Sequence, residues 1–210
     1  MPFTWLFSQP LFFVAWVFAI LVSLTVHEFS HGWAAHFFGD DTAKRSGRLT
    51  LNPLVHIDPF GFILLLVAGF GWAKPVPVNP FNFRNRRWGE ALVALAGPLA
   101  NLACIIVGII LFKFLAPFLG ETNLLINFLF MFVLINTVLM FFNLIPIPPL
   151  DGSHVLFSIL YGNKFANFRE KFERNGPWIL ILIIIGDSFL NLGLFSTAFS
   201  WVFSLLANFL

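Results

Sequence analysis

Apolar residues fill long stretches of the chain, and the lengths of these stretches predict how many helices cross a lipid bilayer. A helix that spans the hydrocarbon core needs about 20 mostly apolar residues. Four regions reach that length, at about 11–38, 89–115, 124–144 and 177–210. The last region is too long for one simple span and is interrupted between 186 and 193, so it forms either one kinked helix or two short ones. The pattern predicts a membrane all-α fold, a polytopic bundle of about four to six transmembrane segments.

A fifth apolar run, residues 60–72, is too short for a full crossing and is more typical of a re-entrant segment. Basic residues flank it on both sides, and basic loops stay in the cytoplasm. A crossing would leave one basic loop outside, whereas a segment that dips in and returns keeps both inside. The flanking sequences GRLTLNP (47–53) and KPVPVNP (74–80) are short, bounded by proline and partly alternating. We therefore expect a re-entrant, β-hairpin-like element after the first helix.

The basic residues also orient the chain. Ten of the twelve Lys and Arg residues lie in three clusters, within 44–48, 84–87 and 164–174. If all three clusters are cytoplasmic, the first helix ends in the cytoplasm, the second runs outward and the third returns. We interpret the clusters as topology determinants and contacts for membrane lipid, and we expect no nucleic-acid partner.

The overall composition agrees with this picture. The chain has 210 residues, of which 59% are hydrophobic and 10% charged, whereas a soluble domain carries about 25% charged residues. The single cysteine, Cys104, excludes an intrachain disulfide. Because the N-terminal residues lack a basic region and a cleavage site, we expect the first apolar segment to be retained. We predict one integral-membrane domain over 1–210, with a helical C-terminal region at 177–210.

The first candidate for chemistry is HEFSH, residues 27–31, which directly follows the uncharged residues 11–26. On a helix, His27 and His31 lie one turn apart on one face, so both imidazoles can bind one zinc ion. Glu28 lies beside them and can accept a proton from water that zinc activates. The alternative is a set of capping or pairing groups at a helix end. Ionisable groups within an apolar segment are costly and mark functional sites, so we favour the metal site.

A catalytic zinc site has three protein ligands and one open position, so a further ligand is expected. Asp151 is the next-to-last residue of the sequence FFNLIPIPPLDG, whose prolines break the third predicted helix at its cytoplasmic end. It therefore reaches the same side of the membrane as the two histidines. Asp187 is the alternative ligand because it interrupts an apolar run, although a helix cap explains it as well. His56 and His154 are interpreted as structural.

Three motifs resemble the site-2 protease family of intramembrane zinc metalloproteases. They are HEFSH in a membrane helix, AGPLAN in the next long one, and NLIPIPPLDG at the end of the one after that. Their order and spacing also match, and GRLTLNPLVHIDPFG and GFGWAKPVPVNP look like the compact bacterial branch without a PDZ or CBS domain. The resemblance covers roughly residues 11–160.

The resemblance implies a function and a site. His27, His31 and Asp151 would bind one catalytic zinc ion, and Glu28 would be the general base. The site would lie within a bacterial cell membrane, toward the cytoplasmic side. The reaction would be hydrolysis of a peptide bond in or near a transmembrane segment of another protein, of the regulated intramembrane proteolysis type.

Two asparagines complete the predicted site. Asn101 either makes an interhelical hydrogen bond or contacts substrate, and the two alternatives are about equally supported. Asn143 either holds the Asp151 loop or contacts substrate, and we favour substrate contact. The extended segments 47–53 and 74–80 could pair with an unwound substrate strand by β-augmentation.

Two other functions fit parts of the sequence. A metal-binding membrane transporter would carry polar groups along several helices, whereas the first predicted helix here is apolar outside its cytoplasmic end. A catalytically idle membrane scaffold would keep the fold, but it has no need of Glu28.

Overall fold

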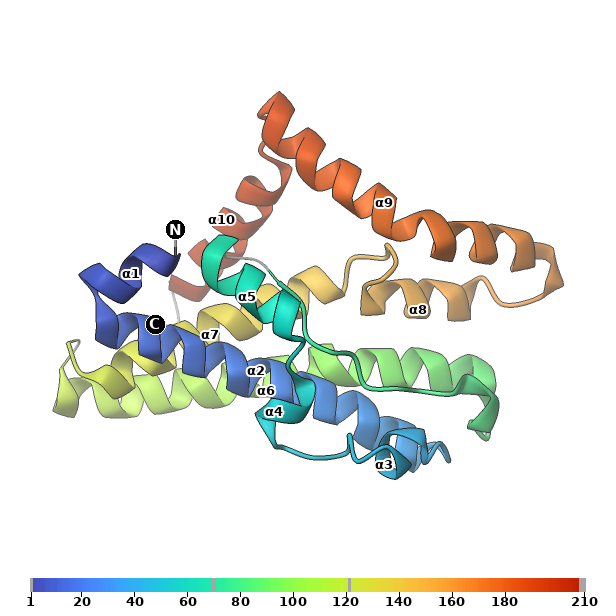
Figure 1. Ribbon diagram of the computed structural model, residues 1–210, viewed down its shortest axis with the longest axis horizontal. Helices are drawn as coiled ribbons and strands as arrows, with labels where there is room; N and C mark the ends of the chain where they lie inside the picture. The colour runs from blue at the N-terminus through green and yellow to red at the C-terminus, as the bar shows by residue number, and fades with distance from the viewer. Residues whose placement is uncertain (1, 69–70, 121, 208–210) are drawn as a thin grey trace.

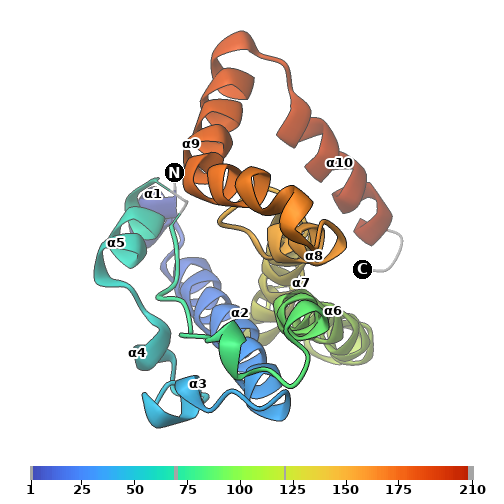
Figure 2. The same ribbon diagram turned by 90° about the vertical axis from the view of Figure 1, so that its right-hand side faces the viewer.

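Three long helices form the centre of the computed structural model, which describes residues 2–68, 71–120 and 122–207. They are α2 (Pro10–Phe37), α6 (Arg86–Leu119) and α7 (Leu124–Asn143). Each packs against the other two (Figures 1 and 2). Within the described ranges, these are the helices long and apolar enough to cross a membrane. The all-α fold is confirmed, and the larger number of membrane segments stays a prediction.

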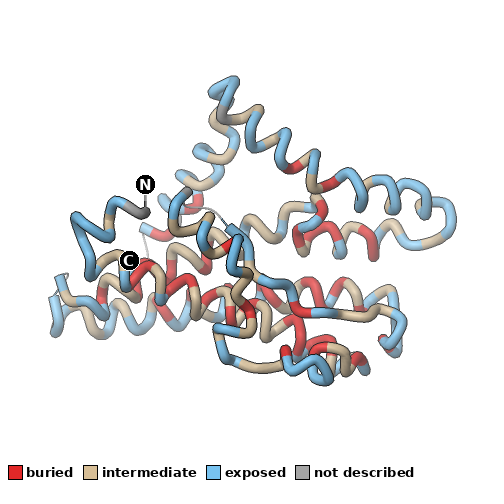
Figure 3. The backbone as a smooth tube through the Cα atoms, viewed as in Figure 1, coloured by how far each residue is buried: buried red, intermediate tan, exposed pale blue. Residues whose placement is uncertain are grey.

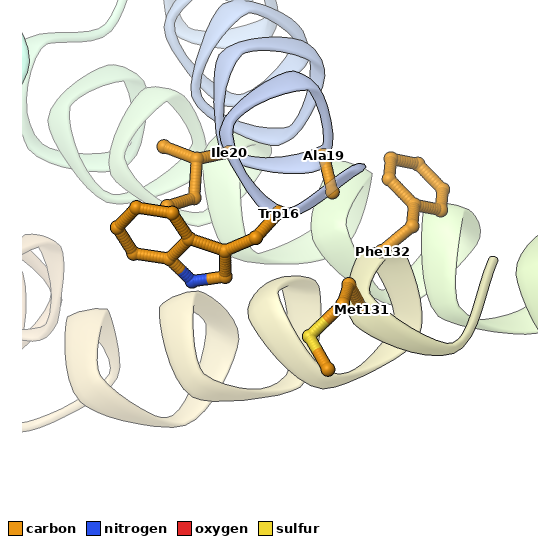
Figure 4. Packing of buried hydrophobic residues seen from close by; sticks show 5 residues of the cluster. All are labelled: Trp16, Ala19, Ile20, Met131 and Phe132. Carbon is orange, nitrogen blue, oxygen red and sulfur yellow. The ribbon is translucent and has the colours of Figure 1, made fainter. Parts of the chain in front are cut away.

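Helices α2 and α7 bury their small and aromatic residues against each other. Trp16, Ala19 and Ile20 of α2 form one cluster with Met131 and Phe132 of α7 (Figure 4). Buried residues concentrate on the sides of α2, α6 and α7 that face one another, whereas α9 and α10 are largely exposed (Figure 3). The outward faces are apolar as well, which suits contact with lipid better than contact with water.

The remaining helical elements are shorter or lie outside the three-helix centre. They are α1 (Pro2–Ser8), α3 (Thr42–Arg45), α4 (Pro53–His56), α5 (Pro59–Ala68), α8 (Asp151–Ile159), α9 (Ala166–Leu190) and α10 (Leu194–Ala207), with 3₁₀ turns η1 (Pro80–Asn82) and η2 (Asn163–Phe165). Helix α8 packs on α6. Helix α3 and the first turns of α6 and α9 lie at the right-hand end of Figure 1, and the turn between α6 and α7 lies at the left. The three basic clusters therefore gather at one end of the molecule.

The region after the first long helix does not form the predicted β-hairpin. Residues 49–51 form bends before α4, which begins at Pro53, and residues 74–79 are extended without a partner strand. Among the described residues, the β-pairing consists of one isolated bridge between Ile57 and Ala73. The prolines at 75, 77 and 80 supply no N–H group, which prevents a regular ladder. Part of the predicted re-entrant run forms α5, which packs beside α1; residues 69–70 lie outside the described residues.

The C-terminal region forms two helices rather than one kinked helix. Asn191 and Gly193 have positive φ angles of 51° and 70°, and the chain turns there between α9 and α10. The carboxylate of Asp187 accepts hydrogen bonds from the N–H groups of Leu194 (2.6 Å) and Phe195 (3.2 Å). Asp187 therefore caps the first turn of α10, which is the structural role considered for it above.

Candidate metal centre and active site

The structure brings His27, His31 and Asp151 together from two helices. His27 and His31 lie on α2, and Asp151 is the first residue of α8. Gly152 lets α8 start tightly against the preceding loop, because a Cβ there would lie 2.3 Å from the Leu144 carbonyl oxygen. The ligand atoms of the three residues all lie within 4.8 Å of one another. Residues more than one hundred positions apart thus form one compact cluster.

Hydrogen bonds fix which nitrogen of each imidazole faces the cluster. His31 Nδ1 lies 2.8 Å from the Val93 carbonyl oxygen, which can only accept, so Nδ1 carries the proton. His27 Nδ1 lies 2.6 Å from Asn101 Oδ1, which also accepts. Each Nε2 is therefore left with a lone pair, the form in which imidazole binds a metal. The histidines are 4% and 8% exposed, so water does little to solvate these lone pairs.

When both imidazoles are neutral with their protons on Nδ1, three atoms with lone pairs face one another at this point. The two Nε2 atoms are 3.0 Å apart, and Asp151 Oδ2 lies 3.2 Å from that of His27 and 3.4 Å from that of His31. Asp151 Oδ2 is buried and has no hydrogen-bond partner among the described residues. Such an arrangement is unfavourable unless a cation lies between the atoms. Two imidazole nitrogens and one carboxylate oxygen form a ligand set of catalytic zinc sites.

Gly97 of α6 leaves space beside the cluster. A Cβ at this position would lie 2.5 Å from His31 Nε2 and 2.7 Å from His27 Nε2. Any side chain would therefore occupy the volume in front of the two lone pairs. Gly97, the glycine of the AGPLAN motif, is thus part of the candidate metal centre. Because it has no side chain, it leaves space for a zinc ion beside the two histidines.

Glu28, next to the metal ligand His27, contacts the extended segment 74–79. Its Oε2 accepts a hydrogen bond of 2.9 Å from the Val76 N–H. The buried side chain of Arg48 holds the preceding residues through the carbonyl oxygens of Lys74 (2.6 Å) and Pro75 (3.2 Å). The carboxylate next to the metal ligands is thus positioned by a backbone segment that follows it by almost fifty residues.

Asp40 anchors the far end of the same segment to the end of α2. Its carboxylate accepts hydrogen bonds from the Asn79 N–H (2.6 Å), the Asn82 amide (2.7 Å) and Thr42. Burial raises the pKa of this carboxyl, but the hydrogen bonds from Asn79, Thr42 and Asn82 outweigh burial and hold the pKa below its ordinary value. Asp40 therefore links the turn after α2 to the segment that contacts Glu28.

An apolar cavity of about 560 Å³ lies beside the site. Leu24 and Thr25 line it from α2, one turn before Glu28, and Ala73 lines it just before the segment that contacts Glu28. Helix α7 contributes a large part of the remaining wall, through residues such as Leu134 and Val138, and α5 contributes Phe62 and Leu65. The cavity is lined mainly by aliphatic and aromatic side chains, so it suits apolar groups.

The other predicted residues lie in different surroundings. Asn101 is fully buried and makes the interhelical hydrogen bond considered above. Asn143 is half-buried and donates to the Leu139 carbonyl oxygen of its own helix, so its contact with substrate stays a prediction. His56 lies 2.8 Å, through Nε2, from the Thr50 carbonyl oxygen, and His154 is exposed. Neither lies in the metal cluster.

Known proteins are similar to this chain in sequence. Residues 119–186 match peptidase family M50. The protein MJ0611 of Methanocaldococcus jannaschii, named as a zinc metalloprotease, is 34% identical over 155 residues, which cover 72% of this chain and 75% of MJ0611. This chain belongs to peptidase family M50. The resemblance to site-2 proteases is thereby confirmed, zinc is the metal of the site, and the three apolar helices agree with the membrane-embedded nature of family M50.

Two further M50 relatives are also named as zinc metalloproteases. YwhC of Bacillus subtilis (strain 168) is 46% identical over 145 residues, which cover 67% of this chain and 66% of YwhC. Rip2 of Mycolicibacterium smegmatis is 34% identical over 139 residues, which cover 63% of this chain and 52% of Rip2. The chain thus spans just under two thirds of YwhC and about half of Rip2. No solved structure matches the chain.

Proposed function

We propose that this M50 chain is an intramembrane zinc metalloprotease that hydrolyses peptide bonds in or near transmembrane segments of other membrane proteins. The observation that carries the proposal is the cluster of two Nε2 lone pairs and one carboxylate, with Glu28 next to His27, on an apolar helix. A structural zinc site has no use for an additional carboxylate, whereas a hydrolase needs a base.

Zinc, when bound by His27, His31 and Asp151, supplies a Lewis acid that polarises a carbonyl group and activates water. Glu28 accepts the proton of the attacking water and delivers it to the nitrogen of the leaving amine. The Val76 N–H holds one oxygen of Glu28, which orients the carboxylate. General acid–base catalysis of this kind contributes about 10²- to 10⁴-fold to a rate.

A membrane-spanning substrate hides its peptide bonds in helical hydrogen bonds, so it has to unwind before cleavage. The segment 74–79 lies against Glu28, so an unwound substrate would pass beside it. Its prolines and the contacts of Glu28, Arg48 and Asp40 remove or occupy most of its backbone hydrogen-bonding groups, so β-augmentation by this segment stays a prediction. The neighbouring apolar cavity supports binding of aliphatic or aromatic substrate side chains. Membrane protein substrates and lipid are therefore the partners that we propose.

The arrangement of charge supports a cytoplasmic orientation of the site in a bacterial cell membrane. Helix α3 and the starts of α6 and α9 carry the basic clusters at one end of the molecule (Figure 1). Basic residues are retained on the cytoplasmic side, so this end is proposed to face the cytoplasm.

A cleavage assay with Glu28→Gln tests the function. Purified wild type and Glu28→Gln are compared on single-span membrane proteins in detergent or bicelles, and the zinc content of both is measured. We expect Glu28→Gln to retain zinc, because Glu28 is not among the clustered ligands, and to lose cleavage at least about 100-fold. Equal cleavage by both proteins would overturn the proposed base. Zinc-loaded wild type that cleaves no substrate but moves zinc into vesicles would favour a transporter.

A further inference from the structure

A buried chain of hydrogen bonds leads from the metal centre into the core of the three-helix unit. His27 Nδ1 contacts Asn101 Oδ1 of α6 at 2.6 Å. Asn101 Nδ2 donates to Asn136 Oδ1 of α7 at 2.8 Å, and Asn136 Nδ2 donates to Ser23 Oγ of α2 at 2.8 Å. Asn101, Asn136 and Ser23 are each 0% exposed. The chain therefore joins all three central helices without access to water.

Backbone carbonyl groups at the far end determine the direction of this chain. Ser23 Oγ donates to the Ala19 carbonyl oxygen at 2.7 Å, and Asn136 Nδ2 donates a second hydrogen bond to the Phe132 carbonyl oxygen at 2.7 Å. Because these carbonyl groups only accept, they keep the nitrogen of Asn136 directed toward Ser23 and Phe132. The oxygen of Asn136 must then face Asn101.

The orientation of Asn136 in turn fixes that of Asn101. Asn136 Oδ1 can only accept, so Asn101 directs its nitrogen toward Asn136 and its oxygen toward His27. That oxygen requires the proton of His27 on Nδ1 and leaves the lone pair on Nε2. A flipped Asn101 amide would donate to Nδ1 and place the proton on Nε2, where it would block metal binding.

We propose that Asn136 and Ser23 are positioning residues that select the metal-binding tautomer of His27 through Asn101. His31 needs no such device, because the Val93 carbonyl oxygen sets its tautomer directly. The inference rests on the zinc site but not on peptide hydrolysis, so zinc affinity tests it independently of the cleavage assay.

Replacement of Asn136 by leucine tests the inference with a side chain of similar shape. Asn136→Leu removes the acceptor that orients Asn101 and leaves the ligands unchanged. We expect zinc affinity, measured by competition with a chelator, to fall roughly 10- to 100-fold. The matched control is Thr137→Val, because Thr137 is also buried on α7 but donates only within its own helix, to the Val133 carbonyl oxygen at 2.7 Å. Thr137→Val should bind zinc like the wild type.

A second comparison, made in the Asn101→Asp protein, separates an effect on the His27 tautomer from a general effect of Asn136→Leu on helix packing. Asn101→Asp introduces a carboxylate that can only accept, so it keeps the proton on His27 Nδ1 whatever lies at position 136. In this background, Asn136→Leu should no longer lower zinc affinity. An equal loss of affinity in both backgrounds would overturn the inference, as would wild-type affinity of a folded Asn136→Leu variant.

Nitrogen NMR of the metal-free protein gives a direct readout. The ¹⁵N shifts of His27 should report a proton on Nδ1 in the wild type and a mixture of tautomers in Asn136→Leu. If Asn136→Leu does not fold, Ser23→Ala removes one acceptor of the Asn136 amide and should produce a smaller shift in the same direction. An unchanged tautomer in a folded variant at either position would contradict the proposal.

Discussion

The metal ligands of this site each direct one atom without a proton, Nε2 of His27 and His31 and Oδ2 of Asp151, toward the same point. The sequence could predict His27, Glu28, His31 and Asp151, because each stands out against an apolar background or a helix break. It could not reveal what Gly97, the Val93 carbonyl group or the Val76 N–H contact, because these contacts depend on how α6 and the segment 74–79 lie against α2. Asn136 is a polar residue in an apolar helix, but its hydrogen-bond partners could be known only from the packing.

Gly97 gives a prediction at this scale. Gly97→Ala places a methyl group 2.5 Å from His31 Nε2, so we expect the variant to lose zinc binding while α6 still forms. Metal analysis of the purified protein measures this loss. Gly186→Ala is the matched control, since a Cβ at that position meets no atom within 4 Å. Equal zinc content in Gly97→Ala and in the control would contradict this prediction, because it would show that a methyl group at position 97 does not block zinc binding.

At the scale of the elements, the three long helices follow from hydrophobic length alone, and their bounds lie close to those predicted. The structure of the segment between α5 and α6 could not be predicted from a hydrophobic pattern in this way. Its alternating pattern indicated a strand, but Pro75 and Pro77 remove the donors that a ladder needs. Side chains hold it instead: Arg48, Glu28 and Asp40 each bind its backbone. Such contacts between distant residues leave no periodic signal in the sequence.

Asp40 provides a prediction about this segment. Its pKa in the folded protein lies below the ordinary value of about 3.9, so its contribution to stability is fully present above that pH and is lost as the pH falls further. We expect Asp40→Asn to lower the free energy of unfolding at neutral pH by about 1–3 kcal/mol, because an amide cannot accept at both positions. The difference from wild type should shrink in acid.

Thermal unfolding of both proteins between neutral pH and pH below about 4 measures this effect. Asp41→Asn is the matched control, because Asp41 is more exposed and contacts His36 rather than the segment. A destabilisation by Asp40→Asn that stays constant across the whole pH range would argue that the charge of Asp40 is not what holds the segment.

At the scale of the whole molecule, the distribution of basic residues indicates which side of the membrane each loop faces, and the fold alone does not. The loops on both sides of residues 60–72 return to the same end of the three-helix unit (Figures 1 and 2). This arrangement supports a segment that enters and leaves the membrane on one side. Sequence alone reached the same expectation through the positive charges, because orientation depends on simple counts of Lys and Arg.

Labelling of single cysteines tests this topology. In a Cys104→Ser background, Lys44→Cys, Arg84→Cys and Thr122→Cys each place one exposed thiol in a different loop. With a membrane-impermeant maleimide, we expect positions 44 and 84 to react only from the cytoplasmic side and position 122 only from the outside. Labelling of 44 and 84 from opposite sides would mean that residues 60–72 cross the membrane.

The buried chain from His27 to Ser23 has a consequence for how the protein is made. Of the three central helices, α2 is synthesised first, and it carries both histidine ligands. The residues that orient His27 are synthesised later, on α6 and α7, and Asp151 follows them. A partly inserted chain therefore has only a weak hold on zinc, because its first imidazole is free to adopt either tautomer. If Asn101 selects the tautomer of His27 as proposed, strong metal binding begins only when the three helices have assembled. Under the proposed function, unfinished copies of the protein would then be unable to cleave peptide bonds.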